Sequence, residues 1–132
     1  MKQLSCVLVV DDDPIAIYLN KRAIKQVDDN ATIEIASNGA EAIEKILRPQ
    51  KCDCVSYIFL DLNMPGMDGF EFIDYFNNLD PSQRENVKII VVSSSQNTKD
   101  LQRLEELGVT KIITKPMVKG ILEELIEGNQ KD

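Results

Sequence analysis

Runs of apolar residues alternate with helical patterns five times along this chain. The first, third and fourth runs are apolar on both faces, which is typical of strands buried between two layers of helices. The second run alternates between apolar and polar residues and the fifth is mixed, as expected nearer the edges of a sheet. The five predicted strands cover residues 4–10, 32–35, 55–60, 87–92 and 109–114. The five segments between and after them repeat apolar residues at helical spacing, so the pattern predicts a parallel sheet with helices on both faces.

Local signals at the helix starts agree with this division. Pro14 suits the first turn of a helix, and Asn38 and Asp68 are each followed three residues later by a glutamate. If the second and fifth strands are the edges, the strand order is 2-1-3-4-5, which is that of a flavodoxin-like three-layer α/β sandwich with a five-stranded parallel sheet and five helices. The chain shows no repeat or linker. We therefore predict one domain over residues 1–132, with its core at about 4–126.

Composition and charge narrow the classes of function. The chain has 132 residues, of which 43% are apolar and 28% charged, an ordinary globular balance. No apolar run approaches the roughly 20 residues of a membrane span, and the N-terminus does not resemble a signal peptide, so we expect a cytoplasmic protein without membrane contact. The net charge of −7, with no basic stripe, argues against nucleic-acid binding. The chain contains no histidine, which excludes a histidine-based catalytic triad.

The three cysteines form an odd set. Cys6, Cys52 and Cys54 occur in a chain without a secretion signal, so we predict reduced thiols rather than a disulfide framework. The spacing of Cys52 and Cys54 lacks the gap usual in zinc sites, and there is no histidine to complete one. A structural zinc is therefore not expected.

Polar residues follow the predicted strands at the edge of the sheet where ligands bind in this type of fold. Acidic residues from two neighbouring strands repel one another and require a cation, and such hard oxygen ligands suit Mg²⁺. The residues concerned are Asp11, Asp12 and Asp13 after the first strand, Asp61 and Asn63 after the third, Ser93 after the fourth and Lys115 after the fifth.

Taken singly, these residues have ordinary structural explanations. Asp13 suits a helix cap, Ser93 a loop hydroxyl and Lys115 a solvated surface charge. Taken together, they fit phosphoryl transfer to an aspartate, which gives an acyl phosphate. A metal ion, a lysine ammonium and a serine hydroxyl can each neutralise or bind one oxygen of the transferred group.

Three segments resemble the receiver domain of two-component response regulators, in the single-domain form typified by a chemotaxis regulator. They are residues 7–14, 58–69 and 112–116, and the resemblance extends over about residues 4–126. The Asp-x-Asn-Met-Pro-x-Met-Asp-Gly pattern that begins at Asp61 is the most specific of them.

The resemblance implies a role for each residue of the site. Asp61 is expected to be the phosphoacceptor, and Ser93 and Lys115 are expected to contact the phosphoryl oxygens. The implied Mg²⁺ ligands are Asp11 through water, Asp12, Asp61 and the backbone carbonyl of Asn63. A cis peptide bond before Pro116 is also implied.

The resemblance further implies partners and a place in signalling. The expected donor is a phosphohistidine on a sensor histidine kinase or a phosphotransfer protein, and the expected output is altered binding of an unknown downstream protein. The chain is then a signalling switch of a phosphorelay rather than an enzyme, and a monomer or a weak phosphorylation-dependent dimer. Ile112 departs from the family, which often has an aromatic residue at this position.

Three other interpretations each fit part of the pattern. A haloacid-dehalogenase-type phosphatase would use Asp11 as its nucleophile, but it needs a further acidic pair after a strand beyond Lys115. A calcium loop starting at Asp61 would place Phe72, which is not a ligand, at its twelfth position. A pure interaction module without phosphorylation has no support in the sequence, because all the residues for phosphorylation are present.

Overall fold

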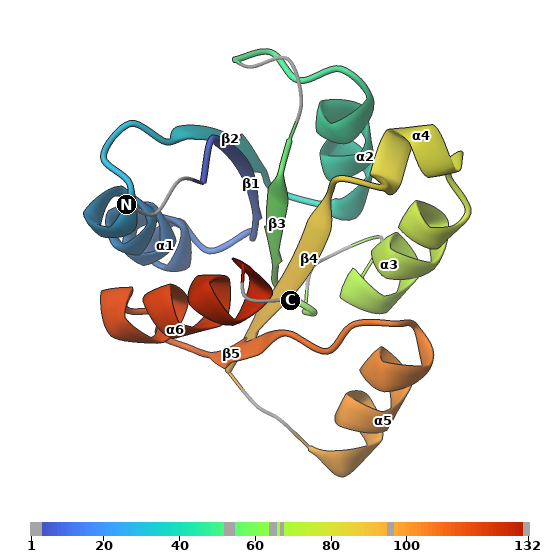
Figure 1. The fold of residues 1–132 in the computed structure, drawn as a ribbon. Helices are drawn as coiled ribbons and strands as arrows, with labels where there is room; N and C mark the ends of the chain where they lie inside the picture. The colour runs from blue at the N-terminus through green and yellow to red at the C-terminus, as the bar shows by residue number, and fades with distance from the viewer. Residues whose placement is uncertain (1–3, 52–54, 64–65, 67, 95–96, 131–132) are drawn as a thin grey trace.

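The strands form one parallel sheet in the order β2-β1-β3-β4-β5, which confirms the predicted flavodoxin-like topology (Figure 1). The computed structural model describes residues 4–51, 55–63, 66, 68–94 and 97–130. Residues 128–130 are described by their backbone alone. The strands are β1 (Cys6–Val10), β2 (Thr32–Ala36), β3 (Tyr57–Leu60), β4 (Lys88–Ser93) and β5 (Ile112–Thr114). The helices are α1 (Pro14–Val27), α2 (Gly39–Leu47), α3 (Gly69–Asn77), α4 (Pro81–Arg84), α5 (Thr98–Glu106) and α6 (Lys119–Gln130).

One helix more than the predicted five is present among the described residues. The extra helix is α4, a single turn within the polar stretch 77–86. It has Pro81 in its first turn after Asp80, and it buries none of its side chains. The apolar pattern could not reveal it, because a helix that buries nothing leaves no apolar stripe.

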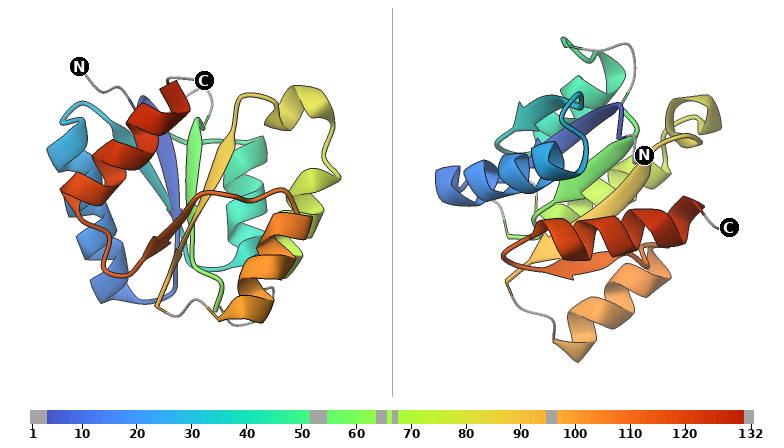
Figure 2. Two further views of the ribbon diagram at one scale, coloured as in Figure 1. Left: turned by 60° about the horizontal axis from the view of Figure 1, so that its bottom comes forward. Right: turned by 60° about the vertical axis from the view of Figure 1, so that its left-hand side comes forward.

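Helices cover both faces of the sheet (Figure 2), and a hydrophobic cluster lies on each face. One contains Leu8, Ile58 and Val91 of the strands together with side chains from α2, α3 and α5. The other contains Val9 and Phe59 with side chains from α1 and α6. Successive strand residues point to opposite faces, so a strand that is apolar at every position is buried on both sides. This arrangement leaves the edge of the sheet at the carboxyl ends of the strands free for polar residues.

The helix starts are capped as the sequence predicts. The Asp13 carboxylate accepts a hydrogen bond from the Ile15 amide at 3.0 Å at the start of α1. Asn38 caps α2, and Asp68 and Glu71 form a capping box at the start of α3. These contacts satisfy amide groups that the first turn of a helix leaves without partners.

Cys6 differs from the prediction of reduced thiols, because it is disulfide-bonded in the structure. Cys52 and Cys54 lie outside the described residues. The chain that follows them returns to the start of β1, where the Ser56 amide donates a hydrogen bond to the Cys6 carbonyl at 2.8 Å. Spacing along the sequence gave no sign of this return.

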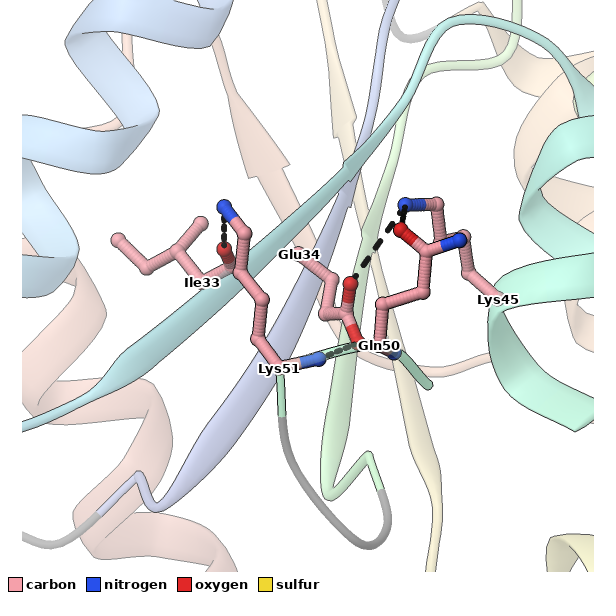
Figure 3. A network of polar contacts seen from close by, with 5 residues as sticks. All are labelled: Ile33, Glu34, Lys45, Gln50 and Lys51. Carbon is pink, nitrogen blue, oxygen red and sulfur yellow. Dashed lines mark hydrogen bonds and ion pairs between the residues drawn. The ribbon is translucent and has the colours of Figure 1, made fainter. Parts of the chain in front are cut away.

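A buried carboxylate fastens the edge strand β2 to the connection after α2 (Figure 3). Glu34 is fully buried and accepts hydrogen bonds from the Gln50 amide at 2.5 Å and the Lys51 amide at 3.0 Å. The Lys45 ammonium lies 3.6 Å from the same carboxylate, and the Lys51 ammonium donates to the Ile33 carbonyl at 3.3 Å. Two amides and a cation therefore compensate this buried charge.

Candidate functional site

The parallel register brings the predicted site residues to one edge of the sheet. Val10 lies opposite Leu60, so Asp11 and Asp61, which follow them, leave adjacent strands side by side. The Asp61 amide donates to the Val10 carbonyl at 3.0 Å, and the Lys115 amide donates to the Ser93 carbonyl at 2.8 Å. Backbone hydrogen bonds of the sheet thus fix where each of these side chains begins.

Three carboxylates form an acidic cluster at this edge. Asp11 and Asp61 are 1% and 6% exposed, whereas Asp12 is exposed to solvent. One carboxylate oxygen from each of the three lies within 4.8 Å of the others. Two oxygens on opposite sides of a magnesium ion are roughly 4.2 Å apart, given bonds of about 2.1 Å. The cluster therefore matches a divalent cation after a small closing movement, or with water in place of one direct ligand.

Lys115 is the cation nearest to these acids in the described part of the chain. Its ammonium lies 3.0 Å from the Asp11 carboxylate and 3.6 Å from that of Asp61. The sequence placed Lys115 beside the phosphoacceptor, but its closer partner is Asp11. One ammonium faces three carboxylates, so the cluster keeps an excess of negative charge.

The charges of the cluster act on one another. Burial raises the pKa of the Asp61 carboxyl above its ordinary value, and the nearby Asp11 carboxylate raises it further, against the opposing effect of Lys115. Burial of the Lys115 ammonium disfavours its charged form and by itself lowers the pKa of Lys115. The hydrogen bond and attraction from Asp11, with a smaller contribution from Asp61, outweigh that effect and raise the pKa of Lys115. Asp61 thus lies where its negative charge is poorly stabilised, as is common at functional sites.

The loop after Asp61 is held close to the sheet. The Asn63 amide donates to the Asp61 carboxylate at 3.4 Å, and the Gly69 amide donates to the Leu62 carbonyl at 2.9 Å. A Cβ atom on Gly69 would lie 2.6 Å from the Leu62 Cα, so only glycine permits this approach. Met64, Pro65 and Met67 fall outside the described residues. The metal-binding role of the Asn63 carbonyl stays a prediction.

One further residue, Ser93, completes the predicted site. Ser93 ends β4, is 2% exposed and lies opposite Thr114 in the register. The peptide bond between Lys115 and Pro116 is cis, as the resemblance implied. Ile112 is half-buried and packs against the hydrophobic cluster on the α2, α3 and α5 face.

One polar residue beside the site was missed by the sequence analysis. Asn20 of α1 is 3% exposed and lines a cavity that Lys115 and Pro116 also line. Asn20 lies one helical turn after Ala16, on the apolar stripe of α1. A polar residue at a position of this apolar stripe was the sequence signal that a buried polar side chain lies here.

Comparison with known proteins gives a family and a fold. The family model described as response regulator receiver domain matches residues 7–127. The protein-glutamate methylesterase/protein-glutamine glutaminase 3 of Geobacter sulfurreducens is 32% identical over 120 residues, which cover 91% of this chain and 30% of that protein. The transcriptional regulatory protein MalR of Bacillus subtilis is 33% identical over 110 residues, covering 83% of this chain and 43% of that protein. The chain thus spans less than half the length of these relatives.

Solved structures agree with this family. A two-component response regulator of Cytophaga hutchinsonii superimposes with a TM-score of 0.85 at 27% identity, covering 99% of this chain and 100% of that one. The chemotaxis protein CheY4 of Vibrio cholerae superimposes with a TM-score of 0.79 at 25% identity, covering 96% and 98%. No helix in the described ranges combines the length and apolar character needed to cross a membrane.

Proposed function

The chain belongs to the response regulator receiver family, and from that premise we propose that it is a magnesium-dependent phosphoacceptor that is phosphorylated on Asp61. One observation carries the proposal. The buried Asp61 carboxylate lies 3.6 Å from the Lys115 ammonium, within a cluster of three acids that has an excess of negative charge. A nucleophilic oxygen and a cation for the transferred group are thereby held together by neighbouring strands.

The proposed reaction transfers a phosphoryl group from a phosphohistidine. An Asp61 carboxylate oxygen forms a bond to phosphorus while the phosphorus–nitrogen bond breaks, and the imidazole nitrogen keeps the electron pair. The product is an acyl phosphate, and attack by water on phosphorus later releases inorganic phosphate and restores the carboxylate. Lys115, which already lies near Asp61, is placed to pair with one phosphoryl oxygen. Ser93, at the end of the adjacent strand β4, is proposed to donate a hydrogen bond to another.

The acidic cluster fits the magnesium ion that the family implies. Asp11, Asp12 and Asp61 supply only hard oxygen ligands, and the exposed side of Asp12 leaves room for bound water. Bound there, the ion would neutralise charge on the phosphoryl oxygens during transfer. The carbonyl of Asn63 is proposed as a fourth protein ligand.

The signalling context is proposed on the same grounds. The donor is a sensor histidine kinase or a phosphotransfer protein, and phosphorylation changes the affinity for a downstream protein. In this proposal the chain acts as a switch in a phosphorelay rather than as an enzyme on a small-molecule substrate. A cytoplasmic location, a single domain over residues 1–132 and a monomeric or weakly dimeric state stay predictions.

Acetyl phosphate tests the proposal without a partner protein. Wild-type protein incubated with acetyl phosphate and Mg²⁺ is expected to gain one phosphoryl group by intact mass, and excess chelator should prevent the gain. Asp61→Asn should remove the gain while leaving the fold unchanged. Asp74→Asn, on the exposed surface of α3, is the matched control and should label like the wild type. Full labelling of Asp61→Asn would show that another residue is the acceptor.

The phosphatase alternative is not favoured by the topology. It requires a further strand with an acidic pair after Lys115, and the described chain beyond that residue continues into α6 without another strand. Asp11, its nucleophile, is also 1% exposed and paired with Lys115 at 3.0 Å.

A further inference from the structure

The start of β1 is joined to another part of the chain by a disulfide bond. Cys6 is the first residue of β1, is 3% exposed and is disulfide-bonded. The chain has only two other cysteines, so the partner of Cys6 within the chain is Cys52 or Cys54. Both belong to the α2–β3 connection, which is residues 48–56. One disulfide uses two of the three cysteines, so a third is left in the same connection.

The α2–β3 connection is hydrogen-bonded to two strands, once before and once after its cysteines. The amides of Gln50 and Lys51, which precede the cysteines, donate to the fully buried Glu34 carboxylate of β2 at 2.5 Å and 3.0 Å (Figure 3). The Ser56 amide, which follows them, donates to the Cys6 carbonyl of β1 at 2.8 Å. The disulfide lies between these two attachments along the chain and therefore fastens the connection to the sheet.

The Cys6 side chain lies on the same face of the sheet as the Glu34 carboxylate. Cys6 and Leu8 belong to the hydrophobic cluster on the α2 side, and Leu8 is paired with Glu34 in the parallel register. If the connection were released, Glu34 would keep the Lys45 ammonium at 3.6 Å but would lose its two amide donors. Loss of hydrogen bonds from a buried carboxylate is unfavourable, so the position of the connection and the compensation of Glu34 are linked.

Thiol–disulfide exchange can form and break this bond. A thiolate of the α2–β3 connection attacks an external disulfide such as glutathione disulfide, which gives a mixed disulfide and one glutathione thiolate. The Cys6 thiolate then attacks the protein sulfur of the mixed disulfide and releases the second glutathione. Two protein thiols thus become a disulfide while glutathione disulfide becomes two thiols. Cys6 suits the second step because its burial keeps external disulfides away. In the reducing cytoplasm that the sequence predicts, disulfides are usually transient.

We propose that Cys6 and the α2–β3 connection form a reversible thiol–disulfide switch, whose oxidised state holds the amides of Gln50 and Lys51 against Glu34. The reduced state releases the connection and weakens the attachment of the edge strand β2. The switch goes beyond the proposed phosphoacceptor function and does not depend on it, because Cys6 lies at the amino end of β1 and the acidic cluster lies at the carboxyl ends of the strands.

The test compares the full chain after oxidation by glutathione disulfide and after reduction by excess reduced glutathione. Alkylation of thiols followed by peptide mapping should find Cys6 in a disulfide in the first sample and as a thiol in the second. Reduction should lower the melting temperature by roughly 10 °C, since the bond closes a loop of about 50 residues. It should also speed hydrogen exchange at the Gln50 and Lys51 amides on the order of tenfold. Renewed oxidation should restore both values.

The double variant Cys52→Ser/Cys54→Ser is the matched control, because it removes the partner of Cys6 and leaves the buried Cys6 side chain in place. In both buffers it should show the melting temperature and exchange rates of the reduced wild type. A response of this variant to glutathione as large as that of the wild type would overturn the switch, because the change would then not come from the disulfide.

Other outcomes would also contradict the proposal. A Cys6 disulfide that resists excess reduced glutathione in the native protein would overturn the reversible switch, and so would oxidised protein without a Cys6 disulfide. Unchanged hydrogen exchange at Gln50 and Lys51 after complete reduction would overturn the link to Glu34. Labelling of Asp61 by acetyl phosphate is a separate measurement, so these failures would leave the proposed function intact.

Discussion

Two regions of this protein contain buried carboxylates, and the groups around these carboxylates differ between the two regions. Around Glu34, two backbone amides and the Lys45 ammonium compensate a single buried charge (Figure 3). At the carboxyl end of the sheet, Asp11 and Asp61 are almost as deeply buried, and each accepts one backbone amide, from Asp13 at 3.0 Å and from Asn63 at 3.4 Å. Together with Asp12 they form a cluster of three acids, beside which the described part of the chain places one ammonium, that of Lys115. The first region is nearly balanced in charge, whereas the second is not.

The difference separates stability from chemistry. A buried charge is costly unless hydrogen bonds and an opposite charge compensate it, so the balanced Glu34 network is expected to stabilise the fold. The acidic cluster is expected to destabilise the metal-free protein, because its repulsion is relieved only when a cation binds. The phosphoryl transfer proposed for this chain would account for the unfavourable arrangement, because such a reaction requires concentrated negative oxygens beside a cation.

The largest effect on stability is expected from the balanced region. Glu34→Ala leaves two amides and the Lys45 ammonium without their shared acceptor, and should lower the free energy of unfolding by about 3 kcal/mol. Glu34→Gln, which keeps one acceptor oxygen, should lose roughly half as much. Asp61→Asn should cause no loss in metal-free buffer. Urea unfolding measures all three variants, and a loss in Asp61→Asn as large as that in Glu34→Ala would remove the contrast between the regions.

Magnesium is expected to stabilise the folded protein through the acidic cluster and not through the Glu34 region. At about one hundred times its dissociation constant, a ligand that binds only the folded state stabilises it by roughly 2.7 kcal/mol. We expect such a gain for the wild type and for Glu34→Gln in thermal unfolding, since Glu34 lies away from the cluster. Asp12→Ala should lose most of the gain through its missing ligand. An equal gain in Asp12→Ala would place the ion elsewhere.

Much of this fold could be predicted because strands that are buried on both faces have apolar residues at nearly every position. The strands β1, β3 and β4 are apolar at nearly every position, and their positions fix the sheet order. The polar residues at the strand ends were likewise predictable, because parallel strands bring their carboxyl ends to one edge. Helix α4 was not, since it buries no side chain.

Other features depend on contacts between residues that are distant in sequence. Glu34 looked like the polar position of an alternating edge strand, yet it is fully buried because amides of Gln50 and Lys51 lie against it. The closer pairing of Lys115 with Asp11 than with Asp61 depends on side-chain placement across three strands. Neither periodicity nor motif spacing contains such information.

Removal of the shared cation should have an intermediate effect. Lys115→Met leaves Asp11 and Asp61 without their described cation and should lower the free energy of unfolding by about 1–2 kcal/mol in metal-free buffer. Saturating Mg²⁺ should narrow the difference from the wild type, because the ion replaces part of the lost charge. Lys45→Met is the matched control in the balanced region, and its loss should not respond to Mg²⁺. A loss in Lys115→Met that Mg²⁺ leaves unchanged would mean that the lysine acts by packing alone.

The smallest expected effect is a dependence of stability on pH that comes from Asp61. Burial, followed by repulsion from Asp11, raises the pKa of this carboxyl in the folded protein above its unfolded value. An acid with a raised pKa disfavours folding where it is ionised, and this penalty disappears as the pH falls through the raised pKa toward the unfolded value. In metal-free buffer, Asp61→Asn should therefore be more stable than the wild type at about pH 8, and this gain should vanish toward about pH 4. Urea unfolding across this range measures the difference. With Mg²⁺ present the gain should shrink or reverse at neutral pH, because a bound cation favours the ionised carboxylate. A gain that grows as the pH falls would mean that the fold stabilises the charge of Asp61, and the contrast with Glu34 would then be wrong.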